Sequence, residues 1–300
     1  MISIAMASYN GEKYLCEQID SILSQTIHHF ELVVCDDCST DLTWKILNDY
    51  AKKDNRIRIF RNVNNIGFKE NFTKAISLTK GDYIALCDQD DIWMPDHLEQ
   101  LLNHLGNKMV ACGDSLLVDS NNRSLNMTLS YQESLDFVPE NDLKKAYSIF
   151  YFRSPFQGAG MLIKRAFFDV ALPIPQEVLF HDVWFSELSC FYGGMNYFEK
   201  PISRYRQHSR NVTGGRIQRR PKLGTWLRKI LRGKYLKDRS YAAIQILGRV
   251  NDLTGNQRLF LEEIIRHGKR KKTFIGRTLN ALFELIHYKF IYSCHGWKWL

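Results

Sequence analysis

Three aspartates, Asp88, Asp90 and Asp91, follow a short apolar segment in the first third of the chain. The segment, residues 83–87, has the length of a buried strand. Carboxylates this close repel one another and lose hydration when buried, so they need a cation or several hydrogen-bond donors. In an extended chain Asp88 and Asp90 point to the same side. Two oxygen ligands with room for more suit Mg²⁺ or Mn²⁺ that also holds a diphosphate. The alternative is a solvated acidic turn that caps the next helix.

Strand and helix patterns alternate through the first hundred residues. Apolar runs predict strands at residues 2–7, 30–35, 57–60 and 83–87, and helical periodicity lies between them. Such alternation with short connections is typical of an α/β fold with a mostly parallel central sheet flanked by helices. Ligands of these sheets bind beyond the carboxyl ends of the strands, where polar residues gather. These residues are Ser8, Asn10, Asp36, Asp37, Asp88, Asp90 and Asp91.

The two common glycine-rich phosphate signatures, G-x-G-x-x-G after the first strand and G-x-x-x-x-G-K-S/T, do not occur in the sequence. A dinucleotide-binding fold and a P-loop enzyme are therefore unsupported. A cation held by the aspartates would have to neutralise any bound phosphate instead.

Beyond residue 95 the alternation loosens. We expect a helix at 95–105 and a polar loop over 120–145 with a short helix near Leu143. Three apolar runs, residues 109–112, 115–118 and 202–207, predict strands. Gly158-Ala159-Gly160 leads into a further strand, and its small residues let the backbone approach a ligand. A helix is expected to open at His181-Asp182. Because an acid at a helix N-terminus is favoured by the dipole, Asp182 could be a plain cap.

The composition is that of an ordinary globular protein, with 45% hydrophobic residues in 300. No run of about 18 apolar residues predicts a membrane span, and no signal peptide is expected at the N-terminus. The seven cysteines are odd in number and scattered, which favours a reducing cytosol over a disulfide framework. Cys35 and Cys38 have the CxxC spacing, but no second pair follows at zinc spacing.

The net charge of +9 is concentrated at the C-terminus, where residues 215–300 hold 20 Lys and Arg against 5 Asp and Glu. Residues 223–232 alternate apolar and basic side chains, which suits an amphipathic helix on an anionic membrane surface. Further helices are expected around residues 239–250, 255–268 and 274–293. Helices that pack on the rest of the protein and expose a basic face are the alternative. No recognised nucleic-acid module accompanies the charge, so nucleic acid is not an expected partner.

Several motifs, in this order and spacing, resemble the family 2 glycosyltransferases, inverting enzymes of the GT-A fold. They are Ser8-Tyr9-Asn10-Gly11-Glu12, Val34-Cys35-Asp36-Asp37-Cys38-Ser39-Thr40-Asp41, Gly81-Asp82-Tyr83 with Asp88-Gln89-Asp90-Asp91, Gly158-Ala159-Gly160, His181-Asp182-Val183-Trp184, and Tyr205-Arg206-Gln207-His208 with Asn211-Val212-Thr213-Gly214. The versions at residues 88–93 and 181–184 resemble the bacterial rhamnosyltransferase-like branch, which builds cell-wall and surface polysaccharide. Cys38 departs from the pattern, because many relatives carry glycine there.

The resemblance covers residues 2 to about 215 and implies a division of the chain. Residues 1–215 would form the GT-A catalytic domain, with a nucleotide-binding part at about 1–112 and an acceptor part at about 113–215. Residues 216–300 would be a basic helical extension.

Carried over position by position, the resemblance also implies roles for single residues. Nucleotide contacts are implied for Ser8, Asn10, Glu12, Asp37, Asn71, Asp88 and Gln89. A divalent cation, Mg²⁺ or Mn²⁺, would be bound by Asp88, Asp90 and His208, and Asp182 would be the general base. We expect His181, Trp93 and Trp184 to border the acceptor, although each tryptophan could equally be a core or rim aromatic.

Sugar transfer needs these groups on chemical grounds as well. A cation stabilises the charge on a leaving diphosphate, and a carboxylate takes the proton of the attacking hydroxyl. The sequence therefore predicts a metal-dependent inverting glycosyltransferase. The donor would be dTDP-rhamnose or a UDP-hexose, and the acceptor a saccharide or lipid-linked saccharide. We expect it in the cytoplasm or on the inner face of the plasma membrane. The alternatives are a catalytically silent scaffold that acts through the basic tail and a sugar nucleotidyltransferase.

Overall fold

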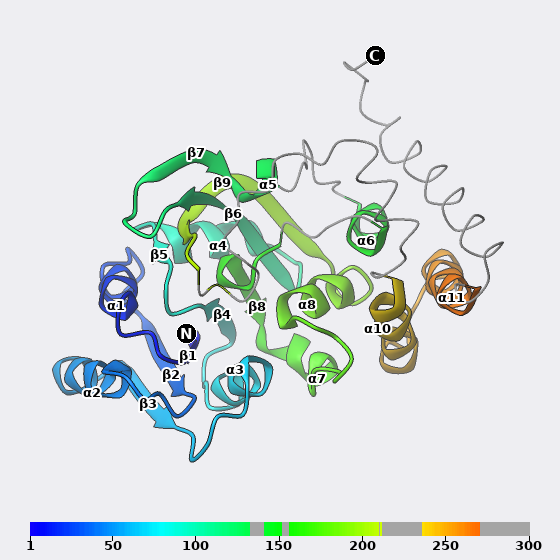
Figure 1. Cartoon of the computed structure of the whole chain (residues 1–300). Helices are drawn as coiled ribbons and strands as arrows, with labels where there is room; N and C mark the ends of the chain where they lie inside the picture. Colours follow the sequence, from blue (N-terminus) through cyan, green and yellow to red (C-terminus); the bar gives the residue numbers. More distant parts are fainter. Residues whose placement is uncertain (133–140, 152–155, 210, 212–235, 271–300) are drawn as a thin grey trace. The chain divides into compact units, whose positions relative to one another are not determined.

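The computed structural model describes residues 1–132, 141–151, 156–209, 211 and 236–270 (Figure 1). The chain forms two compact units. The first comprises residues 1–136, 155–174 and 193–217, and the second residues 137–154, 175–192 and 218–300. The bounds of these units differ from the predicted linear division, because residues 137–154 and 175–192 group with the C-terminal residues. The assignment of a catalytic domain and a basic extension stays a prediction.

The first unit is built on one nine-stranded sheet with the order β3-β2-β1-β4-β8-β6-β9-β5, and β7 pairs with β6 beside this path. Its first four strands in the chain pair with one another in parallel: β1 (Ile2–Ser8), β2 (Phe30–Asp36), β3 (Ile57–Arg61) and β4 (Tyr83–Cys87). All seven residues of β2 are buried. A strand covered on both faces has no reason to alternate polar and apolar residues, which explains the continuous apolar runs in the sequence.

The other strands extend the sheet with mixed directions. They are β5 (Ile92–Trp93), β6 (Val110–Val118), β7 (Ser124–Thr128), β8 (Met161–Lys164) and β9 (Met195–Arg206). Strand β8 is antiparallel to both β4 and β6, whereas β9 is parallel to β6. The two strands expected at 109–112 and 115–118 are one strand. The interruption between them is a register shift opposite β9 at Gly113, Asp114 and Ser115.

Helices flank the sheet of the first unit. They are α1 (Leu15–Leu23), α2 (Thr43–Lys53), α3 (Phe68–Ser77), α4 (His97–Leu105) and the short α5 (Leu129–Gln132) and α7 (Phe168–Ala171). Helix α1 buries Leu15, Ile19 and Ile22 completely, as the predicted apolar stripe requires. Each such side chain stabilises the fold by about 1.5–3 kcal/mol relative to leaving it in water.

The second unit is helical within its described residues. It contains α6 (Asp142–Tyr151), α8 (His181–Ser189), α10 (Leu236–Arg249) and α11 (Gly255–Arg270). Three of its buried aromatic rings cluster together, with ring centroids of Phe150 and Phe260 5.6 Å apart and those of Phe191 and Phe260 5.9 Å apart. The helices predicted near 239–250 and 255–268 are confirmed. The expected helix at 274–293 and the amphipathic segment at 223–232 lie outside the described residues.

No helix among the described residues combines the length and the apolar character that crossing a bilayer would need.

Candidate active site

The predicted convergence of polar strand ends is confirmed for β1 and β2. The parallel register places Ser8 beside Asp36, and the backbone N–H of Asp37 donates to the carbonyl of Ser8 at 2.8 Å. Strand β4 pairs with the other side of β1 as far as Met6 and Cys87. The polar segments after all three strands therefore begin at the same edge of the sheet.

The loop after β1 is locked to the loop after β2 by reciprocal hydrogen bonds. The N–H of Asn10 donates to Ser39 Oγ at 2.9 Å, and the Asn10 side-chain oxygen accepts from the N–H of Thr40 at 2.9 Å. Glu12 Oε2 accepts from the N–H of Leu42 at 2.9 Å. Asn10 and Glu12 thus shape the edge by fixing loops, and direct nucleotide contacts from their side chains stay a prediction.

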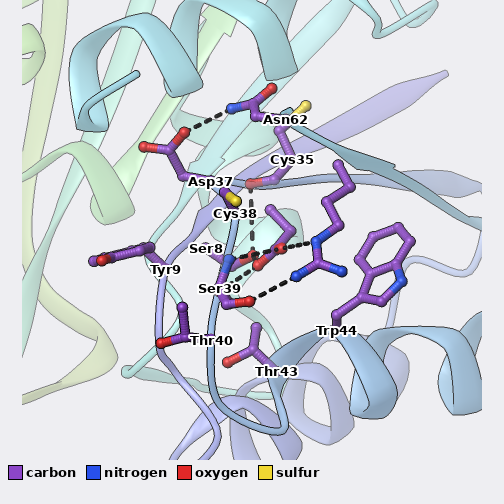
Figure 2. Close-up of polar contacts among 12 residues, drawn as sticks. Ser8, Tyr9, Cys35, Asp37, Cys38, Ser39, Thr40, Thr43, Trp44 and Asn62 are labelled. Atoms are coloured by element: carbon purple, nitrogen blue, oxygen red, sulfur yellow. Dashed lines mark hydrogen bonds and ion pairs between the residues drawn. The ribbon is translucent and has the colours of Figure 1, made fainter. Parts of the chain in front are cut away.

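Asp36, which was not among the predicted site residues, organises the turn after β2 (Figure 2). Its buried carboxylate accepts from the N–H of Ser39 at 3.1 Å and from the Ser39 hydroxyl, and it lies 3.3 Å from Arg61 Nε. Arg61 also donates to the Ser39 carbonyl at 2.6 Å and stacks over the Trp44 ring at 5.3 Å. The Ser8 hydroxyl donates to the same carboxylate at 3.4 Å, so three donors and a cation offset the cost of burying this charge.

Cys38 sits in the same turn with φ 62°, in the left-handed region. A side chain at this φ costs about 1–2 kcal/mol that glycine does not. The unusual residue noted in the sequence therefore keeps the turn geometry at an energetic cost.

Asp37 anchors the loop that follows β3 (Figure 2). Its Oδ1 accepts from Asn62 Nδ2 at 2.7 Å and from the N–H of Ile66 at 2.9 Å, and its Oδ2 accepts from the N–H of Gly67 at 2.9 Å. Asn62 also donates to Asn71 Oδ1 at 2.9 Å. Asp37 is 2% exposed and Asn71 is 1% exposed, so both side chains support the loop from the interior of the protein. A direct contact of either side chain with a nucleobase stays a prediction.

Gln89 fastens the loop after β1 from the opposite side. Its amide nitrogen donates to the Tyr9 carbonyl and its amide oxygen accepts from the Tyr9 N–H, both at 2.9 Å. The Tyr9 ring remains 46% exposed. Gly11 makes room for this arrangement, because a Cβ there would lie 2.1 Å from Gln89 Oε1. Gln89 thus positions a loop with an accessible aromatic ring, a candidate base-stacking surface that sequence reasoning missed.

Asp90 and His208, predicted as metal ligands, lie together although 118 residues separate them. His208 Nε2 and Asp90 Oδ2 are 2.8 Å apart, and the side chains are 10% and 18% exposed. Among the described residues no group of three or more His, Cys, Asp or Glu side chains is arranged to hold a metal ion. Within the described residues Asp88 is thus not brought into a three-ligand group with Asp90 and His208, and its role as a metal ligand stays a prediction.

The remaining pair fits a cation that arrives with its substrate. A nitrogen and a carboxylate oxygen 2.8 Å apart are close to the roughly 3 Å that separates adjacent ligands in octahedral sites with bonds of about 2.1 Å. Mg²⁺ sites of phosphate-transferring enzymes typically use one or two protein ligands and take the others from substrate phosphates and water. A cation here would need a nucleotide diphosphate to complete its shell.

Asp91, the third acid after β4, has a structural role. It is completely buried and accepts from Gln157 Nε2 at 3.0 Å and from the Arg206 N–H at 3.2 Å. Burial raises the pKa of the Asp91 carboxyl well above its usual value, and the nearby Asp90 and Asp88 raise it further. An acid so placed joins strands and does not face a ligand.

The expectation that Trp93 and Trp184 border the acceptor is wrong in this structure. The Trp93 ring is 2% exposed and stacks on His97 with ring centroids 3.9 Å apart, and Trp184 is 0% exposed with the Arg249 guanidinium 5.2 Å from its ring. Each indole lies on a buried element directly after a charged motif, Trp93 on β5 and Trp184 on α8, and each is packed inside its unit. His181 is 7% exposed, and burial lowers its pKa, although neighbouring Asp182 opposes this.

Asp182, the predicted base, lies in the first turn of α8 in the second unit. Its Oδ1 accepts from the N–H of Val183 at 2.7 Å, and the side chain is half-buried. The positive end of the helix dipole favours a carboxylate there. The local geometry is compatible both with a cap and with a base, so the catalytic role stays a prediction.

Comparisons with known proteins agree with this architecture. The sequence profile described as glycosyl transferase family 2 matches residues 3–167, more than half of the chain. The chain therefore belongs to glycosyl transferase family 2.

Single curated relatives match only part of this chain. The UDP-Glc:alpha-D-GlcNAc-diphosphoundecaprenol beta-1,3-glucosyltransferase WfaP of Escherichia coli is 34% identical over 110 residues, which is 37% of this chain and 43% of that protein. Other curated glycosyltransferases match over 32% to 42% of their own length. The chain thus spans well under half of these relatives.

Solved structures show the same fold over nearly the whole chain. Staphylococcus aureus TarS, residues 1–349 in complex with UDP-GlcNAc, superimposes with a TM-score of 0.63 at 20% identity, covering 97% of this chain and 81% of that one. The mannosyltransferase PcManGT from Pyrobaculum calidifontis, in complex with GDP-Man and Mn²⁺, gives 0.55 at 18% identity, covering 99% and 76%. The mixed sheet flanked by helices is thus of the GT-A type, which confirms the predicted fold class.

Proposed function

We propose that the protein is a metal-dependent inverting glycosyltransferase. It would move a sugar from a nucleotide diphosphate to a saccharide or lipid-linked saccharide in bacterial surface polysaccharide synthesis. The observation that carries the proposal is the contact of 2.8 Å between Asp90 and His208 in a family 2 chain. The two side chains provide the nitrogen and oxygen ligands that a nucleotide-bound cation needs.

The donor would lie along the carboxyl edge of β1 and β2. Its base would rest against the exposed Tyr9 ring and the loop that Asp37 anchors, and its diphosphate would extend toward Asp90 and His208. Support comes from the TarS structure with UDP-GlcNAc and from the mannosyltransferase structure with GDP-Man and Mn²⁺. A UDP-hexose and dTDP-rhamnose are the donors we propose to test first.

The transfer would be one displacement at the anomeric carbon. Asp182 would accept the proton of the acceptor hydroxyl, and the attack would expel the nucleoside diphosphate from the opposite face, which inverts the anomeric centre. The cation, when bound, supplies electrostatic stabilisation of the charge on the leaving diphosphate. A lipid-linked acceptor is favoured by the relative WfaP, whose name specifies a diphosphoundecaprenol substrate. Work at the inner face of the plasma membrane would follow from such an acceptor.

The first test is a thermal-shift panel on the full chain with UDP-, dTDP- and GDP-sugars, each with Mn²⁺ and with EDTA. A ligand that binds only the folded state raises the apparent stability. The proposal expects a rise with one donor class that Mn²⁺ strengthens and that Asp90→Asn loses. A chain that binds none of these nucleotides and releases no nucleoside diphosphate would favour the scaffold alternative.

The second test separates binding from chemistry at Asp182. Asp182→Asn should keep the nucleotide affinity and lose transfer by about 10²-fold or more. Asp169→Asn is a matched control, because Asp169 also lies in the first turn of a helix but is exposed. Equal turnover in wild type and Asp182→Asn would remove Asp182 from the chemistry.

A further inference from the structure

Arg206, the last residue of β9, is a buried cation with unusually many partners. Its side chain is 1% exposed, and its guanidinium donates to the carbonyls of Asp90 at 2.9 Å and Ser120 at 3.3 Å. Among the described residues its guanidinium forms an ion pair with Glu17 on α1 at 2.6 Å, and the Glu17 side chain is 54% exposed. Burying a guanidinium is costly unless its donors are used. The position of these donors indicates what the charge is used for.

Arg206 fixes the chain segment that carries Asp90. The side-chain bond to the Asp90 carbonyl is matched by a backbone bond, in which the Arg206 N–H donates to Asp91 Oδ1 at 3.2 Å. Two hydrogen bonds to the adjacent residues Asp90 and Asp91 fix the position of the turn after β4. Arg206 thus positions the Asp90 carboxylate indirectly, by holding the backbone that carries it.

Arg206 also fixes His208, two residues further along the chain. The side chain of Asn211 donates to the Arg206 carbonyl at 2.8 Å and accepts from the His208 N–H at 2.6 Å, which closes a tight turn between them. The His208 ring stacks on Tyr14 with centroids 4.9 Å apart and planes 26° from parallel. The same Tyr14 ring lies 4.5 Å from the Arg206 guanidinium. The Tyr14 ring therefore contacts both the Arg206 guanidinium and the His208 imidazole.

We infer that Arg206 and Tyr14 are positioning residues that hold the Asp90 carboxylate and the His208 ring as a preformed pair for a cation. The inference rests on the proposed function, in which this pair receives the cation of the nucleotide. Neither residue contacts the cation. They act by keeping both ligands in place before it arrives, so that its binding need not order them. Residues that orient metal ligands typically contribute 10- to 100-fold to metal affinity.

The test measures UDP and dTDP binding to the full chain by calorimetry, with Mn²⁺ and with EDTA. Arg206→Lys keeps the charge but loses the fork of donors, and Tyr14→Leu removes the stacked ring. Both should bind the metal-free nucleotide like wild type, because that affinity comes from the edge around Asp37. The strengthening by Mn²⁺ should fall about 10-fold or more. Tyr14→Phe, which keeps the ring, should behave like wild type.

The possible results separate this inference from the function on which it rests. If Mn²⁺ does not strengthen nucleotide binding to the wild type, the proposed cation site is wrong and the inference falls with it. If Mn²⁺ strengthens binding equally in wild type, Arg206→Lys and Tyr14→Leu, the cation site stands and the positioning role is overturned. If Arg206→Lys fails to fold, the contrast between Tyr14→Leu and Tyr14→Phe decides.

Discussion

Gly11→Ala should displace Gln89 and loosen the loop after β1. A Cβ on Gly11 would lie 2.1 Å from Gln89 Oε1 and 2.5 Å from its Cδ, so the amide has to leave its place. These atoms are the far end of a flexible side chain, which can swing into solvent without moving backbone. The cost is then the two hydrogen bonds to Tyr9. Both bonds are exposed, so each contributes at the lower end of the usual range, about 0.5–1 kcal/mol, and their loss amounts to about 1–2 kcal/mol of unfolding free energy.

A double-mutant cycle tests this account. Gln89→Ala alone should cost the same about 1–2 kcal/mol, because it removes the same two bonds. In the Gln89→Ala background the clash is absent, and Gly11→Ala should be neutral or stabilising by up to about 1 kcal/mol through the less flexible unfolded chain. The two changes should therefore be coupled by about 1–2 kcal/mol in urea unfolding.

Gly248→Ala is the matched control, because a Cβ at this helical position meets no atom within 4 Å. It should stabilise the chain by up to about 1 kcal/mol. Additive effects of Gly11→Ala and Gln89→Ala would refute the reasoning, since they would mean that Gln89 is not what a side chain at residue 11 displaces.

Three further changes test single features of the fold. Burial lowers the pKa of His97 to about 3, below the ordinary 6.5, so the unfolded chain binds the extra proton as the pH falls below 6.5. Stability should therefore drop by about 2 kcal/mol between pH 7 and pH 5, and urea unfolding of His97→Gln should show a shallower pH dependence. Cys38→Gly should stabilise the chain by up to about 1 kcal/mol, because relief of the left-handed strain exceeds the added flexibility of the unfolded chain. Cys38→Val should lose about 2 kcal/mol or more in the same unfolding curves. Asp36→Asn should cost about 1.5–3 kcal/mol in the same unfolding curves, because the Ser39 N–H and hydroxyl lose a charged acceptor, whereas the exposed Arg61 can be hydrated.

The parallel half of the sheet could be predicted from the sequence because its signals are local. Apolar runs and helical stripes depend on neighbouring residues, and β4 begins and ends where the pattern placed it. The division into units was out of reach, because α6 and α8 join the C-terminal helices through contacts between segments far apart in the chain. Burial of Trp93 and Trp184 was likewise invisible, since an indole beside a polar motif has the same sequence pattern in a core as at a rim.

The aspartates at the strand ends show why the sequence suggests more candidate metal ligands than the folded chain leaves in a position to bind a cation. Asp36, Asp37 and Asp91 are each at most 2% exposed and each accept hydrogen bonds from loops or side chains that they hold in place. Sequence spacing marks all of them as equal to Asp90, because it records where a carboxylate enters the chain and not which donors reach it after folding. Asp90 differs because its partner is His208, a side chain that can itself bind a metal. Whether a strand-end aspartate supports a loop or could serve as the proposed metal ligand therefore depends on a residue far away in the sequence, and for Asp90 that residue lies on the turn after β9.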